Sequence, residues 1–181
     1  GVPAIAVGGG RFPDYNNPIF LDYHEKLIKA LGGRYGQSPD IDHVDIGSIG
    51  CWGEWNMACC QGVERQCQQY FPTEDVQITI TDWYFKYFPQ VPLVMLHNGQ
   101  LLYAARRGAG WRGDCFGDYG YFGPNWNHME QAYPPVLQDP VIAAAWSARL
   151  IDFFAAPRDI LRPAPWLHEL KLAGLPSPST M

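Results

Sequence analysis

Continuous apolar runs alternate along this chain with stretches in which apolar residues recur at helical spacing. Four runs have the pattern of short strands buried on both faces: residues 2–7, 44–49, 91–96 and, more weakly, 110–115. Five stretches carry helical spacing or helix-start signals: residues 18–31, 73–89, 98–107, 125–137 and 141–154. The glycine-rich residues 8–17 are expected to form a long loop. Alternating strands and helices predict an α/β fold with a parallel sheet.

Local signals mark the ends of two of these helices. Asn17 can cap a helix with its side chain, and Pro18 has a φ angle suited to the first turn. The apolar spacing of this helix stops at Gly32 and Gly33, where we expect it to end. Thr73 is the expected cap of the next helix, which should stop near Pro89.

Two architectures fit this order of elements: a doubly wound open sheet and a (β/α)₈ barrel. A full barrel needs about 250 residues. This chain has 181, so a barrel would be incomplete. The chain lacks an initiator Met and a visible signal peptide, so its N-terminus looks truncated. We expect residues 1–154 to form the fold and the proline-rich residues 155–181 to be an irregular tail.

Composition excludes several classes of partner. Lys and Arg number 13 against 18 Asp and Glu, and no basic cluster is present, so nucleic-acid binding is not expected. No apolar run reaches the roughly 18 residues that a membrane span needs. The five cysteines are an odd number and lack paired metal-ligand spacing. We therefore expect free thiols, no bound metal and a mild preference for a reducing compartment.

Polar and aromatic residues gather after the predicted strands, where α/β proteins place functional groups. The candidates for substrate binding are Asp14, Asn16, Trp52, Trp55, Asn56, His97, Arg112, Asp114, Asp118, Trp126 and His128. Indole faces pack against the C–H face of a sugar, and short polar side chains bind its hydroxyl groups. The triple glycine at 8–10 lacks the remainder of a phosphate-binding motif, so no nucleotide cofactor is expected. The set favours a carbohydrate ligand.

Glu54 is the candidate catalytic residue. It follows a predicted buried strand and lies between Trp52 and Trp55. Apolar rings raise the pKa of a carboxyl group, as a general acid working near neutral pH requires. The structural alternative is a Glu54 that forms an ion pair with an arginine in a rigid loop.

The segment Val44-Asp-Ile-Gly-Ser-Ile-Gly-Cys-Trp-Gly-Glu-Trp55 resembles the fourth strand of retaining glycoside hydrolases of clan A. The resemblance is to β-galactosidase-like and related bacterial barrels with a G-x-W-G-E-W segment. Further stretches resemble the same group: residues 13–18, 81–96, 110–118 and 126–129. The resemblance covers about residues 2–146. It implies that the chain contains roughly strands three to six of a (β/α)₈ barrel and that Glu54 is the general acid/base.

The chain departs from this family at the second carboxylate. The family's nucleophile is a Glu after strand seven, whereas residues 141–146 contain no acid. The later acids Asp152, Asp159 and Glu169 follow no convincing strand, which leaves Asp114 or Asp118 as replacements. Without a partner carboxylate, we expect little or no hydrolase activity from this chain.

Two other classes of function stay open at this point. The first is a non-catalytic carbohydrate-binding module, and the second is an open-sheet enzyme with another substrate. An incomplete barrel would also leave parallel strands unpaired at its edges, which predicts self-association.

Overall fold

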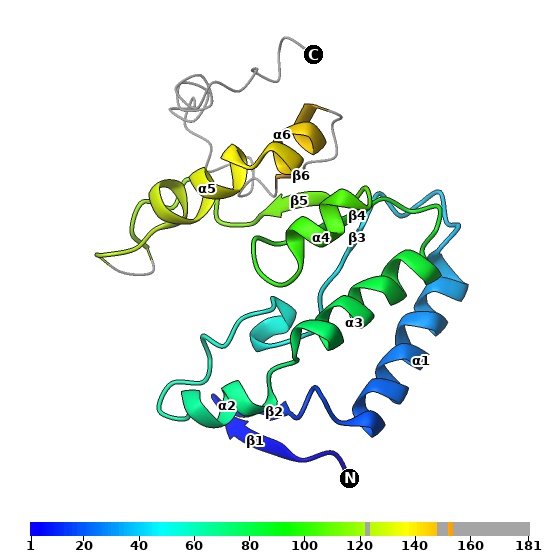
Figure 1. The fold of residues 1–181 in the computed structure, drawn as a ribbon, viewed down its shortest axis with the longest axis vertical. Helices are drawn as coiled ribbons and strands as arrows, with labels where there is room; N and C mark the ends of the chain where they lie inside the picture. Colours follow the sequence, from blue (N-terminus) through cyan, green and yellow to red (C-terminus); the bar gives the residue numbers. More distant parts are fainter. Residues whose placement is uncertain (122–123, 148–151, 154–181) are drawn as a thin grey trace.

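The computed structural model describes residues 1–121, 124–147 and 152–153 (Figure 1). The strands are β1 (Ala4–Val7), β2 (Gly10–Pro13), β3 (Val44–Asp45), β4 (Leu93–Met95), β5 (Gly110–Gly113) and β6 (Asp152–Phe153). The α-helices are α1 (Pro18–Tyr35), α2 (Glu64–Tyr70), α3 (Glu74–Tyr87), α4 (Leu101–Arg106), α5 (Tyr133–Gln138) and α6 (Pro140–Ser147). A 3₁₀ turn, η1 (Cys51–Gly53), and a π-helical turn, η2 (His128–Ala132), complete the described elements.

The strands form two sheets. Strands β1 and β2 make an antiparallel hairpin in which Val7 pairs with Gly10. Gly8 and Gly9, with φ angles of 47° and 83°, make the tight turn between them, a conformation that favours glycine. Strands β3, β4, β5 and β6 form a parallel sheet in that order.

The prediction of an incomplete (β/α)₈ barrel is wrong. The described residues form an antiparallel hairpin and a separate, short parallel sheet, and no barrel is present among them. The run at residues 2–7 was expected to be the first of four parallel strands. It belongs to the hairpin instead, because Gly8 and Gly9 turn the chain back on itself, so residues 8–17 are not one long loop. The fold is a mixed α/β arrangement.

Several other predicted elements are confirmed. The runs at 44–49, 91–96 and 110–115 contain strands that pair in parallel. The Asn17 side chain accepts a hydrogen bond from the Ile19 N–H and caps α1. Helix α3 occupies the predicted region, and α4 is shorter than predicted.

The C-terminal elements differ from the prediction. The stretch at 125–137 divides into η2 and α5, and the helix predicted for 141–154 ends at Ser147. Residues 152–153 are a strand, β6, that pairs with β5. Helix α2 had no predicted counterpart. The predicted tail at 155–181 lies outside the described residues.

Helix α1 continues past the glycines at which it was expected to end. Figure 1 shows α1 and α3 side by side, and Gly32 lies where they meet. A Cβ atom on Gly32 would clash with the Tyr87 carbonyl oxygen and would lie 2.7 Å from the Tyr87 Cβ. Gly32 therefore allows close packing rather than ending the helix, which reaches its C-cap at Gly36.

The core lies between the helices and the parallel sheet. Its fully buried side chains include Ile28 of α1, Ile80 of α3, Met95 of β4 and Trp111 of β5. These side chains fix the strands whose ends carry the polar residues described below. None of the described helices is both long enough and apolar enough to cross a membrane. Self-association through strand edges stays a prediction.

Candidate functional site

Polar side chains meet where the parallel strands end. We call this group the strand-edge cluster, and it comprises Asp45, Glu54, His97, Arg112, Asp114 and His128. Asp45 is the last residue of β3, and His97 lies shortly after β4. Arg112 lies in β5, and Asp114 follows that strand directly. Glu54 follows η1, and His128 is the first residue of η2. Their mutual electrostatic interactions and ring contacts join them into one group. Five of these six were predicted site residues, and Asp45 is the addition.

Arg112 lies between two carboxylates. Its Nη1 is 3.0 Å from Asp45 Oδ2, and its Nη2 is 3.8 Å from Asp114 Oδ2. The second oxygens of both carboxylates, Asp45 Oδ1 and Asp114 Oδ1, are buried and have no hydrogen-bond partner among the described residues. Burial raises the pKa of Asp45, and the charge of Arg112 opposes this. Asp45, Arg112 and Asp114 therefore form one half-buried network of ion pairs.

Glu54 is half-buried and forms no salt bridge among the described residues. Its carboxylate accepts a long hydrogen bond from the Asn56 side chain, at 3.5 Å, and its backbone oxygen accepts one from Asn98 at 3.2 Å. Burial raises the pKa of Glu54, the negative charge of Asp114 raises it further, and Arg112 and Asn56 lower it. The ion-paired alternative considered from the sequence is therefore absent here.

The loop around Glu54 is strained. Ser48, Trp52 and Trp55 have positive φ angles of 70°, 56° and 57°, which residues with a side chain seldom adopt. Gly50 also has a positive φ, and a Cβ atom there would lie 2.9 Å from the Asn56 backbone nitrogen. Residues held in such conformations are concentrated at functional sites. The strain favours a functional role for the loop that carries Glu54.

Replacing Glu54 should change how stability depends on pH. Because the pKa of Glu54 is raised on folding, its contribution to stability is present below the unfolded pKa and is lost as pH rises through the folded pKa. Glu54→Gln should therefore raise the urea midpoint at neutral pH relative to the unsubstituted protein, with a smaller gain below about pH 4. Glu74→Gln, at an exposed position in α3, controls for the loss of one negative charge. An equal gain at both pH values would contradict this expectation.

The three predicted tryptophans have different surroundings. Trp52 and Trp126 are 72% and 43% exposed, whereas Trp55 is 3% exposed. The indole N–H of Trp55 donates to the Ile46 carbonyl oxygen at 2.7 Å, so this side chain belongs to the core. The Trp126 ring centroid is 4.6 Å from that of His128, which places it beside the strand-edge cluster. Trp52 and Trp126 are the exposed indoles near Glu54 and His128.

Asp14 and Asn16 do not join the strand-edge cluster. The Asn16 side chain donates to the Phe71 carbonyl oxygen at 2.9 Å and accepts from the Thr73 N–H at 2.8 Å. The Asp14 carboxylate accepts from the Asn16 N–H at 3.0 Å. These contacts tie the segment after β2 to the start of α3, which is a structural role.

Asp118 anchors the loop that leads to His128. Its carboxylate accepts hydrogen bonds from the backbone N–H groups of Gly120, Tyr121 and His128, and lies 2.7 Å from His128 Nδ1. Burial alone would raise the pKa of Asp118, but these hydrogen bonds outweigh it and hold the pKa well below its usual range. Asp118 is therefore an ionised anchor and a poor replacement for a missing nucleophile.

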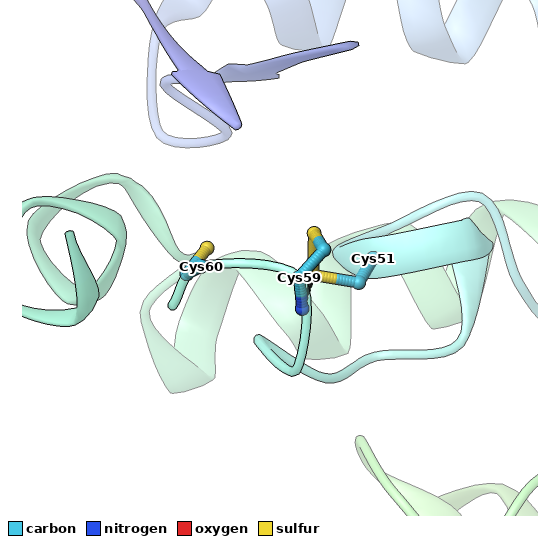
Figure 2. Close-up of side chains that lie close together, drawn as sticks. All are labelled: Cys51, Cys59 and Cys60. Carbon is cyan, nitrogen blue, oxygen red and sulfur yellow. Dashed lines mark hydrogen bonds between the residues drawn. A yellow bond between two sulfur atoms is a disulfide. The ribbon is translucent and has the colours of Figure 1, made fainter. Parts of the chain in front are cut away.

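The expectation of free thiols is wrong for four of the five cysteines. Cys51 bonds to Cys59, and Cys60 bonds to Cys67, across sequence separations of 8 and 7. Figure 2 shows the Cys51–Cys59 bond with the Cys60 sulfur nearby. The odd count misled the interpretation, because it leaves one thiol over without preventing two disulfides. The signal in the sequence was the pair of near-equal spacings on either side of the adjacent Cys59 and Cys60.

These disulfides affect both the site and the expected compartment. Cys51 is the first residue of η1, and η1 ends directly before Glu54. The Cys51–Cys59 disulfide therefore restrains the loop that carries the candidate acid. Disulfides are typical of oxidising compartments, which reverses the mild preference for a reducing one. Cys115 is the free cysteine. Burial, followed by the charge of Asp114, raises the pKa of its thiol to about 12, so it is a poor nucleophile at neutral pH.

Comparisons with family models, with curated proteins and with solved structures give no match to this chain. The strand-edge cluster is therefore the feature of this chain that points to a function.

Proposed function

We propose that the strand-edge cluster binds carbohydrate and that Glu54 acts there as a general acid in glycosidic bond cleavage. The observation that carries the proposal is a half-buried Glu54 with a raised pKa and no salt bridge, in a strained loop at the end of a parallel sheet. The resemblance of the Trp52–Trp55 segment to clan A glycoside hydrolases supports the same role. Asn56 and His97 supply polar groups for sugar hydroxyls, and Trp52 supplies an exposed indole.

General acid catalysis of glycosidic bond cleavage requires Glu54 to be protonated and to donate its proton to the glycosidic oxygen as the bond breaks. Burial favours the neutral carboxyl, and the charge of Asp114 acts in the same direction. The Asn56 side chain is placed to orient the carboxyl group through its 3.5 Å contact. These groups provide a proton donor beside a set of hydroxyl-binding side chains.

One observation favours a second candidate, carbohydrate binding without cleavage. Cleavage uses a second carboxylate as nucleophile or base. The neighbouring Asp45 and Asp114 both lie against Arg112, and Asp118 is bound by His128. Among the described residues, no other carboxylate interacts with Glu54. We therefore expect the chain to cleave glycosidic bonds slowly and expect carbohydrate binding to be easier to detect than cleavage.

The test compares turnover and binding in matched variants of the full chain. A panel of aryl glycosides reports turnover, and titration calorimetry with oligosaccharides reports affinity. Glu54→Gln should lower kcat/KM about 100-fold or more while sugar affinity stays nearly constant. Trp52→Ala should weaken sugar binding about tenfold. Glu74→Gln, on exposed helix surface, should change neither quantity.

The outcomes separate the two candidates. Turnover that needs Glu54 supports a hydrolase, whereas sugar binding that needs Trp52 and survives in Glu54→Gln without any turnover supports a binding module. A chain that neither binds nor cleaves any sugar of the panel contradicts both.

A further inference from the structure

We propose that Asp114, Cys115 and His128 form a binding site for a divalent transition metal ion such as Zn²⁺. Each residue offers one ligand atom, a carboxylate oxygen, a sulfur and an imidazole nitrogen, and these atoms all lie within 4.8 Å of one another. Ligand atoms at about 2.0–2.3 Å from one tetrahedral zinc ion lie about 3.3–3.8 Å from one another, which is below this upper limit of 4.8 Å. The three residues come from two segments, the end of β5 and the start of η2, that the fold brings together.

The imidazole of His128 has the second contact that metal-binding histidines usually have. Its Nδ1 lies 2.7 Å from the Asp118 carboxylate, which is itself held by backbone N–H groups. A carboxylate on one ring nitrogen fixes the orientation of the ring and increases the basicity of the other nitrogen. A metal ion would therefore be bound by Nε2 of His128, with Asp118 as the orienting group.

Two buried polar atoms next to the site have no hydrogen-bond partner among the described residues. They are Asp114 Oδ1 and His97 Nδ1. The ring centroid of His97 lies 5.8 Å from that of His128, and His97 interacts electrostatically with Asp114, but its nitrogens are not among the three ligand atoms that lie within 4.8 Å of one another. Buried polar atoms normally have partners, and their exceptions often mark an ion or a water molecule. A cation bound to Asp114 would satisfy the first of these atoms.

The donor set indicates which metal to expect. One thiolate, one imidazole and one carboxylate suit Zn²⁺, whereas Mg²⁺ and Ca²⁺ take oxygen ligands. The backbone around the ligands is also fixed, because the Cys115 N–H donates to the Tyr133 hydroxyl oxygen at 2.8 Å. The sulfurs of Cys51, Cys59 and Cys60 are similarly close together, but they are used in disulfides. Of the two groups, the one at Cys115 is therefore the one whose cysteine can release its proton to solvent and bind a metal ion as a thiolate.

The first experiment uses the unsubstituted, oxidised chain and the metal alone. Cys115 is its free cysteine, so an alkylating reagent without reductant modifies only that position. Zn²⁺ at ten times its dissociation constant should slow alkylation of Cys115 about tenfold, and a chelator should restore the rate. Mg²⁺ at the same concentration should have no effect. Alkylation that Zn²⁺ does not slow counts against the site.

The second experiment identifies the ligands with Co²⁺ in place of Zn²⁺. The full chain should give the near-ultraviolet absorption of a cobalt–thiolate bond, and Cys115→Ser and His128→Ala should lose it. Asp118→Asn should keep this absorption but weaken affinity about 10- to 100-fold. His43→Ala, remote in sequence from the site, should bind like the unsubstituted protein. Absence of the cobalt–thiolate absorption in the full chain, or its persistence in Cys115→Ser, overturns the proposal, whatever the outcome of the sugar experiments.

Discussion

Removal of the Cys60–Cys67 disulfide is expected to lower the free energy of unfolding by about 2–3 kcal/mol. The bond closes a short loop, with a sequence separation of 7, and so restricts the unfolded chain. Both cysteines are fully buried, so the Cys60→Ala/Cys67→Ala double variant also loses packing against the core. Urea unfolding followed by tryptophan fluorescence measures the loss.

The Cys51→Ala/Cys59→Ala double variant is the matched comparison. Its loop is of nearly the same length, with a sequence separation of 8, but Cys59 is only partly buried. It should therefore lose less stability than the Cys60→Ala/Cys67→Ala variant. Thiol titration of the denatured chain must find one free thiol before reduction and five after it. Unchanged urea midpoints in both double variants would show that the disulfides do not stabilise the fold.

The second large effect is expected at two adjacent glycines of α1. Gly32→Ala places a methyl group against the Tyr87 backbone, so α1 and α3 must move apart at a cost of about 1–3 kcal/mol. Gly33→Ala meets no atom within 4 Å at an exposed helical position, and should stabilise the protein by about 0.5–1 kcal/mol. Thermal unfolding by circular dichroism should give shifts of opposite sign.

These two variants are controls for one another, because each adds the same methyl group at one of two adjacent positions that lie on different faces of one helix. Helix propensity alone predicts that both are stabilising. Stabilisation by Gly32→Ala equal to that by Gly33→Ala would therefore contradict the close packing of α1 on α3.

The sequence allowed prediction of the elements whose signals are local. Asn17 before Pro18 gave the start of α1, and the apolar runs gave three strands of the parallel sheet. Glycine was the main source of error, because its role depends on neighbours far along the chain. Gly8 and Gly9 make a hairpin turn and Gly32 packs against Tyr87, whereas the pattern suggested a loop and a helix end.

The candidate site could be predicted only in part for the same reason. The strand-end rule found Glu54, His97, Arg112, Asp114 and His128, which the structure brings together. It could not separate them from Asn16, whose side chain binds the start of α3, or from Trp55, which is buried. Those roles depend on contacts between distant segments. Residue type and strand position alone do not reveal them.

The order of the parallel strands in space is their order along the chain: β3, β4, β5 and β6. During synthesis on the ribosome, each of these strands emerges after the neighbour that it will pair with. Pairing can therefore proceed outward from β3, with one edge growing as translation continues. No later strand has to insert between two strands that are already paired. The nascent chain therefore does not have to break hydrogen bonds that it has already formed.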